Sequence, residues 1–97
     1  GITGMRKIAG MAEAFGLNCE IGTAGNSSLN AANLHVICSI GNCDYYEWWM
    51  PAEAHQFGLI DHYGLNNRMT LNAPETPGLG CPLDEEWIGA HRVATLE

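Results

Sequence analysis

Apolar side chains recur every three or four residues at the start of the chain, which is the spacing of one helix face. The positions on this face are Ile2, Met5, Ile8, Ala9, Ala12 and Phe15. Thr3 is available to cap the first turn and Gly16 to stop the last one. The pattern therefore predicts a helix over residues 3–15.

Two short segments with a second helix between them follow. Residues 17–21 are apolar apart from Asn18 and Glu20, and residues 44–48 are rich in aromatic side chains, so both favour strands. Residues 27–40 are predicted to be helical up to Gly41, with a buried stripe of Leu29, Ala32, Val36 and Cys38 to Ile40.

The alternation of helix and strand, with connections of a few residues, predicts a parallel α/β arrangement with right-handed crossovers. Two strands and two helices leave sheet edges and apolar faces uncovered. We therefore expect the first sixty residues to be units of a larger sheet or barrel.

The remainder of the chain, from residue 50 onward, shows a less regular pattern of apolar and polar residues. Residues 50–68 show no clear period, residues 69–71 could form a short strand, and the run "APETPGLGCP" is rich in turn residues. Residues 83–93 are expected to close with a helical turn, because Asp84 to Glu86 would sit at its positive end.

Composition narrows the class of protein. The 97 residues suffice for one small domain, and no run of ~18 apolar residues predicts a membrane span. Four Lys and Arg against eleven Asp and Glu give a net charge of −7, which repels phosphate backbones and anionic membranes. The four cysteines show no Cys-x2-Cys pair, so we interpret them as reduced thiols of a cytoplasmic protein rather than as a disulfide framework or a zinc site.

Four motifs, taken in order, have a family resemblance: "GITGMRKIAGMAEAFGL", "TAGNSSLNAANLH", "YYEW" and "APETPGLGCPLDEEWI". Together they resemble the C-terminal part of the mandelate racemase and muconate lactonizing branch of the enolase superfamily. The resemblance implies a (β/α)7β barrel, which is a variant of the TIM barrel, with an α+β capping domain. Residues 1–60 would be the C-terminal part of the barrel, with strands seven and eight at 17–22 and 44–48. Residues 61–97 would be a tail that packs on the capping domain.

The resemblance also implies an activity. Enzymes of this family remove the proton alpha to a substrate carboxylate and stabilise the resulting enediolate on Mg²⁺, with a Lys or His base. For this chain it implies an acid-sugar dehydratase, or an isomerase such as a cycloisomerase or racemase, with a small carboxylate as substrate and a homo-oligomeric assembly. The metal ligands are expected upstream of this segment. The alternative is a noncatalytic fragment or assembly module that pairs with a partner chain.

Five residues are candidates for the site. By resemblance, Glu47 in its acid form would donate a hydrogen bond to the substrate carboxylate, and its aromatic neighbours would favour that form. Many relatives carry a histidine base where this chain has Gly22. Thr23 and Asn26 offer a hydroxyl and an amide to a polyhydroxylated substrate, and Trp48 could form a pocket wall. The alternatives without a functional role are that Glu47 is solvated or ion-paired and that Trp48 serves only in packing.

The neighbours of these candidates have structural interpretations. Ser27 and Ser28 are expected to cap the helix that follows, and Gly25 to serve the backbone turn. His35 lies in the middle of a helix, so we interpret it as a packed structural histidine. The lone histidines of the tail have no metal-ligand spacing.

Overall fold

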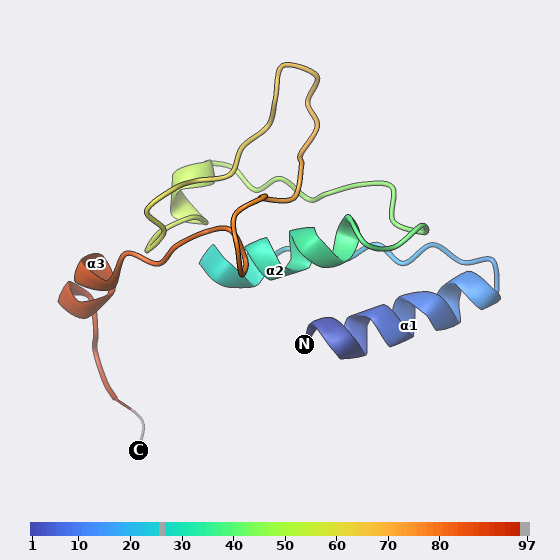
Figure 1. Cartoon of the computed structure of the whole chain (residues 1–97), viewed down its shortest axis with the longest axis horizontal. Coiled ribbons are helices and arrows are strands. Elements are labelled where there is room, and N and C mark those ends of the chain that lie inside the picture. Colours follow the sequence, from blue (N-terminus) through green and yellow to red (C-terminus); the bar gives the residue numbers. More distant parts are fainter. Residues whose placement is uncertain (26, 96–97) are drawn as a thin grey trace.

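A computed structural model of the chain describes residues 1–25 and 27–95. Its elements are the helices α1 (Ile2–Ala14), α2 (Ser27–Ile37) and α3 (Glu85–Ala90), with a 3-10 turn, η1 (Ala52–Ala54), between α2 and α3 (Figure 1). All three predicted helices are present. The main difference is at the end of α2, which stops three residues before the predicted end at 40.

The end of α1 follows its sequence, whereas its beginning does not. Gly16 has a positive φ of 67°, its amide donates to Glu13 O at 2.9 Å, and the Leu17 amide donates to Ala12 O at 2.9 Å. This is the Schellman arrangement that glycine permits after a helix. At the start, the cap position is Gly1 and no side chain caps the helix, so the predicted cap by Thr3 is wrong.

The apolar face of α1 is only partly covered. Ala9 is buried against the rest of the chain, while Ile8, Met11 and Phe15 are 63%, 67% and 79% exposed. These three residues lie at helical spacing on one side of α1 and form an open apolar stripe. The prediction that the first helix has uncovered faces is confirmed for this element.

The buried face of α2 differs from the predicted one. Leu29 and Cys38 are exposed, and the buried residues are Asn30, Ala31, Asn33, Leu34 and Val36. Of the residues predicted to form the buried stripe, only Val36 is fully buried. The reason is that α2 turns two asparagine amides toward carbonyl groups of the preceding segment, which a count of apolar residues does not detect.

The two predicted strands are extended segments without a regular ladder, so the strand assignments for 17–21 and 44–48 are wrong for the described residues. They still lie side by side and run parallel. Cys19 N donates to Asn42 O at 2.7 Å, and Thr23 N is bonded to the Glu47 side chain at 3.0 Å, so the contacts advance in the same direction along both segments.

Side chains take the place of the ladder. The Glu20 carboxylate accepts hydrogen bonds from the backbone amides of Asp44 and Tyr45, both at 3.3 Å, and the Asn42 amide donates to Ala9 O and Leu17 O at 3.1 and 3.0 Å. Parallel strands are normally flanked by further strands and covered on both faces. Neither segment has a second neighbouring strand among the described residues.

The tail packs on α2. A small core joins Ala31 to Leu59 and Cys81, with Tyr63 and Leu79 packed against it, and the His35 ring nitrogen Nε2 lies 3.0 Å from Leu79 O. His35 is thus a half-buried structural residue, as expected. The predicted contact of residues 61–97 with a capping domain stays a prediction.

Two local features of the tail complete the fold. The segment predicted as a strand at 69–71 follows a turn instead, in which Asn66 Oδ1 accepts hydrogen bonds from the amides of Arg68 and Thr70 at 2.8 and 3.1 Å. The predicted terminal helix is confirmed, because Asp84 caps α3 by accepting from Trp87 N at 2.8 Å. Among the described residues, every helix is too short or too polar to cross a membrane.

Candidate functional site

Glu47 lies where the two extended segments end side by side. Its Oε2 accepts a hydrogen bond from Thr23 N at 3.0 Å, and its backbone carbonyl accepts one from the Thr23 hydroxyl at 2.6 Å. Oε1 has no hydrogen bond within residues 1–25 and 27–95, and the residue is exposed. Among the described residues, one carboxylate oxygen is therefore fixed and the other has no protein donor.

The position of Gly22 leaves space beside this carboxylate. A Cβ atom placed on Gly22 would meet only Glu47 Oε2, at 3.8 Å, which is an ordinary van der Waals distance. A side chain at this position would therefore lie against the carboxylate. The absence of a side chain at Gly22 keeps the near side of Glu47 open.

Thr23 is completely buried, with an exposed fraction of 0%. Its hydroxyl donates to the backbone carbonyl of Glu47 and its backbone amide donates to the carboxylate, so Thr23 holds Glu47 at two points. Direct contact of Thr23 with a substrate stays a prediction. Asn26, the fourth sequence candidate, lies outside the described residues.

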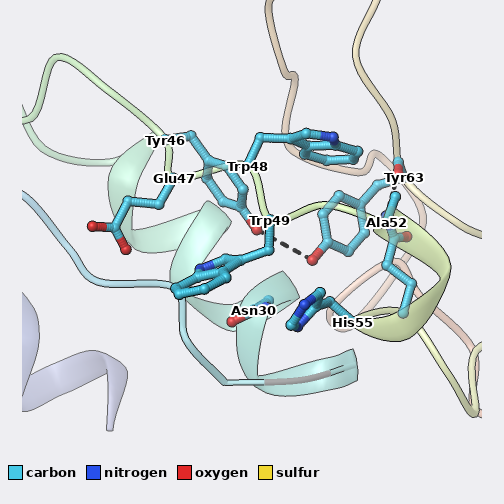
Figure 2. A pocket seen from close by; sticks show the side chains of 9 residues that line it. Asn30, Tyr46, Glu47, Trp48, Trp49, Ala52, His55 and Tyr63 are labelled. Atoms are coloured by element: carbon cyan, nitrogen blue, oxygen red, sulfur yellow. Dashed lines mark hydrogen bonds between the residues drawn. The ribbon is translucent and has the colours of Figure 1, made fainter.

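The aromatic residues do not surround Glu47 as the sequence suggested. Successive side chains of an extended segment point to opposite sides, and Figure 2 shows the Glu47 carboxylate pointing away from the Tyr46 and Tyr63 pair. Trp48 packs with these tyrosines, with ring centroids 6.3 and 6.2 Å apart. Tyr46, Trp48 and Tyr63 thus pack on the opposite side, and Trp49 lines the same small cavity as Glu47.

The tyrosine pair is a neutral structural contact. The two hydroxyl oxygens lie 3.2 Å apart, and burial raises the pKa of Tyr46 and, to a smaller extent, that of Tyr63 above the ordinary value for a phenol. The cavity between these rings, Trp49 and His55 has a volume of about 10 Å³, close to the space that one water molecule requires. The aromatic cluster therefore packs the site from behind and cannot take a substrate by itself.

Two asparagines of α2 support the segment that carries Gly22 and Thr23. Asn33 Nδ2 donates to Gly22 O at 3.2 Å, and Asn30 Nδ2 donates to Gly25 O at 3.1 Å. Sequence reasoning did not select either residue. The available signal was their i, i+3 spacing on a helix of otherwise small and apolar residues, where a buried amide needs a partner.

Glu20 was also missed, and it is the hydrogen-bonding centre at the other end of the two segments. Beyond the two backbone amides, it accepts from Cys43 Sγ at 3.2 Å and from Asn18 Nδ2 at 3.3 Å. The Cys43 thiol is the largest of the contacts that hold the pKa of Glu20 below its ordinary value, and burial raises the pKa of Cys43. Both carboxylate oxygens of Glu20 are therefore occupied by protein donors.

The described residues offer no metal centre. No three His, Cys, Asp or Glu side chains within residues 1–25 and 27–95 gather closely enough to hold an ion. A Mg²⁺ ion therefore does not fit the donors of this part of the chain.

Comparison with known proteins places the chain in a family. The family model described as "Enolase C-terminal domain-like" matches residues 1–87. A crystal structure assigned to a mandelate racemase/muconate lactonizing enzyme from Pseudovibrio sp. superimposes with a TM-score of 0.89 at 30% identity. The match covers 97% of this chain and 25% of that one, so the chain spans a quarter of the length of this relative. The search of curated proteins found no match.

The family model covers most of the chain, and the structural match agrees with it. The protein therefore belongs to the enolase C-terminal domain-like family, on its mandelate racemase and muconate lactonizing branch.

Proposed function

We propose that this chain supplies the C-terminal part of an enolase-superfamily enzyme that abstracts the proton alpha to a substrate carboxylate. The substrate class is a sugar acid or a related hydroxy acid, and the reaction is a dehydration or an isomerisation. The observation that carries the proposal is Glu47, whose Oε2 is fixed by Thr23 N at 3.0 Å and lies beside Gly22, and whose Oε1 accepts no hydrogen bond within residues 1–25 and 27–95.

In this proposal Glu47 acts in its acid form. A proton on Oε1 would be donated to an oxygen of the substrate carboxylate, while Oε2 stays bonded to the Thr23 amide. As the alpha proton leaves, negative charge develops on that carboxylate, and a donor already in place stabilises it without reorganisation. Glu47 would thus contribute more to the transition state than to the bound substrate.

The proton-abstracting base and the metal belong to other parts of the site. A Mg²⁺ ion would supply charge neutralisation for the substrate carboxylate, and the described residues hold no group of ligands for it. Its ligands and the base are therefore proposed for residues outside this segment, and the residues of this chain bind and orient the substrate.

Gly22 narrows the reaction type within the proposal. A histidine base at this position would stand against Glu47, and glycine cannot accept a proton. Racemisation by two opposed bases, one of them on this side, is therefore disfavoured. A reaction with one base on the opposite face, such as an elimination or a cycloisomerisation, remains compatible with the site.

The noncatalytic assembly module is the weaker alternative, because the family match extends over residues 1–87 and includes Glu47 and its surroundings. The open apolar stripe on α1 is compatible with an enzyme in which this helix packs against further chain.

The test is the substitution Glu47→Gln in the full-length protein. Glutamine keeps an oxygen that can accept from the Thr23 amide, so folding should be unaffected. Its NH₂ group can still donate a hydrogen bond, but it is a far weaker acid than a carboxylic O–H and stabilises the charge on the substrate carboxylate less. Turnover should fall at least about 100-fold, the usual effect of removing a general acid. It would be measured on a panel of sugar acids, together with exchange of the alpha proton in D₂O. Turnover at the wild-type rate would remove Glu47 from the mechanism.

A further inference from the structure

The peptide group between Gly22 and Thr23 is hydrogen-bonded on both sides. Its carbonyl oxygen accepts from Asn33 Nδ2 at 3.2 Å, and its amide donates to Glu47 Oε2 at 3.0 Å. One planar peptide therefore connects a side chain of α2 to the carboxylate of the candidate site (α2 is labelled in Figure 1).

Such a connection couples its two ends. A donor at the carbonyl oxygen polarises the peptide and makes its N–H a stronger donor, so hydrogen bonds in a chain reinforce one another. Asn33 is only 7% exposed, and little water can replace its amide. The orientation of the peptide, and with it that of the Glu47 carboxylate, depends on this buried contact.

The Thr23 side chain adds a second constraint on the same glutamate. Its hydroxyl donates to Glu47 O at 2.6 Å, and the residue is fully buried. Thr23 thus holds Glu47 at the backbone through its side chain and at the carboxylate through its amide. Two points of attachment fix both the position of the residue and the rotation of its side chain.

We propose that Asn33 and Thr23 are positioning residues that hold the Glu47 carboxylate in its productive orientation, Asn33 through the Gly22–Thr23 peptide and Thr23 directly. The inference rests on the proposed function of Glu47. Neither residue touches the substrate in this assignment, and both act through Glu47.

The chain offers a matched control in Asn30. This residue lies on the same helix, is 3% exposed, and donates its amide to the carbonyl of Gly25 at 3.1 Å. It resembles Asn33 in type, burial and kind of contact, but the carbonyl that it binds is that of Gly25, which is not part of the Gly22–Thr23 peptide. Substitutions at the two asparagines should therefore cost similar stability and differ in activity.

The experiment compares Asn33→Leu with Asn30→Leu in the full-length protein. Asn33→Leu should lower kcat roughly fivefold, the effect of one hydrogen bond, with KM little changed, while Asn30→Leu keeps the wild-type kcat. A second pair covers the case in which Asn33→Leu does not fold: Thr23→Val should lower kcat by a similar factor, and Thr23→Ser, which retains the hydroxyl, should restore it.

A further measurement separates this inference from the proposed function. Hydrogen exchange at the Thr23 amide should become faster in Asn33→Leu than in Asn30→Leu, whatever Glu47 does in catalysis. If Glu47→Gln is inactive while both asparagine variants retain equal kcat and equal Thr23 exchange, the positioning role is overturned. If Glu47→Gln is fully active, the proposed function fails. The comparison of Thr23 amide exchange in the two asparagine variants then still decides whether Asn33 acts on this peptide.

Discussion

Glu20 and Glu47 lie at opposite ends of the two paired extended segments, and their carboxylates accept different numbers of hydrogen bonds. Each accepts hydrogen bonds from backbone amides of the other segment. Within residues 1–25 and 27–95, Glu20 uses both carboxylate oxygens, with four protein donors, whereas Glu47 uses one. Both residues are exposed glutamates in extended segments. They differ in how many of their carboxylate oxygens accept hydrogen bonds from the protein.

That difference separates a structural role from a functional one. A carboxylate whose oxygens are both engaged cannot bind a ligand without losing contacts that hold the two segments together. In the described part of the chain, Glu47 Oε1 accepts no hydrogen bond, and no side chain at Gly22 covers the carboxylate near Oε2. Hydrogen-bond occupancy therefore favours Glu47 over Glu20 as the candidate for a functional role.

The largest expected effect is a difference in activity between the two matched substitutions. Glu47→Gln should lower turnover by at least about 100-fold, as proposed above, while Glu20→Gln should leave turnover of the folded protein near the wild-type value. Steady-state kinetics of both full-length variants would measure this. Equal losses of turnover in the two variants would contradict the division of roles.

The second prediction concerns the space beside Glu47 and uses two nearby glycines. A Cβ on Gly25 would lie 2.5 Å from Leu29 Cδ2, 2.9 Å from Leu29 Cγ and 3.1 Å from Asn30 Oδ1. Gly25→Ala should therefore lower the free energy of unfolding by about 1 kcal/mol, the lower range for overpacking. Gly22→Ala meets no such contact and should leave stability unchanged.

Activity should follow the opposite order. The methyl group of Gly22→Ala occupies the space next to Glu47 Oε2 and should raise KM. Gly25→Ala should leave KM close to the wild-type value, because its clash with Leu29 acts on stability. Urea unfolding and steady-state kinetics of the same two proteins measure both quantities. A Gly22→Ala protein with unchanged KM would show that substrate does not use this space.

The sequence predicted the helices better than the segments between them. The helical spacing in α1 and the glycine at 16 are local signals, and both were confirmed apart from the cap. Strand formation depends on neighbouring strands, which a local sequence pattern does not contain. The apolar and aromatic runs at 17–21 and 44–48 therefore predicted backbone hydrogen-bond ladders, whereas side chains make most of the contacts between these segments. Family motifs, unlike local patterns, identified the fold family through residues far apart in the chain.

For the site, the sequence selected residues that the structure brings together, but it assigned their surroundings incorrectly. Gly22, Thr23 and Glu47 meet at one place. The aromatic neighbours of Glu47 were expected around it because they are adjacent in sequence, yet alternation in an extended segment turns Tyr46 and Trp48 to the other side. Asn33 and Glu20 were missed because a count of apolar residues does not detect hydrogen bonds to a distant segment.

The smallest expected effect is a pH dependence of stability at Glu20. The contacts with Cys43 and the neighbouring donors lower the pKa of Glu20 from its ordinary value of 4.5, so the charged form is favoured in the folded protein. Its stabilising contribution is therefore present above about pH 4.5 and is lost as pH falls through the lower folded pKa. Because the residue is exposed to solvent, the contribution is small.

Glu20→Gln tests this dependence, because a glutamine must turn its NH₂ group toward donors that now bind two oxygens. The urea midpoint of this variant should lie below that of the wild type at pH 7, and the difference should shrink as the pH is lowered from 4.5 through the lowered folded pKa of Glu20 and the wild-type carboxylate becomes protonated. Glu75→Gln, at an exposed tail position, is the control and should show no such change. A gap between Glu20→Gln and wild type that is constant over this pH range would mean that the charge on Glu20 does not join the two segments, and the contrast with Glu47 would then rest on geometry alone.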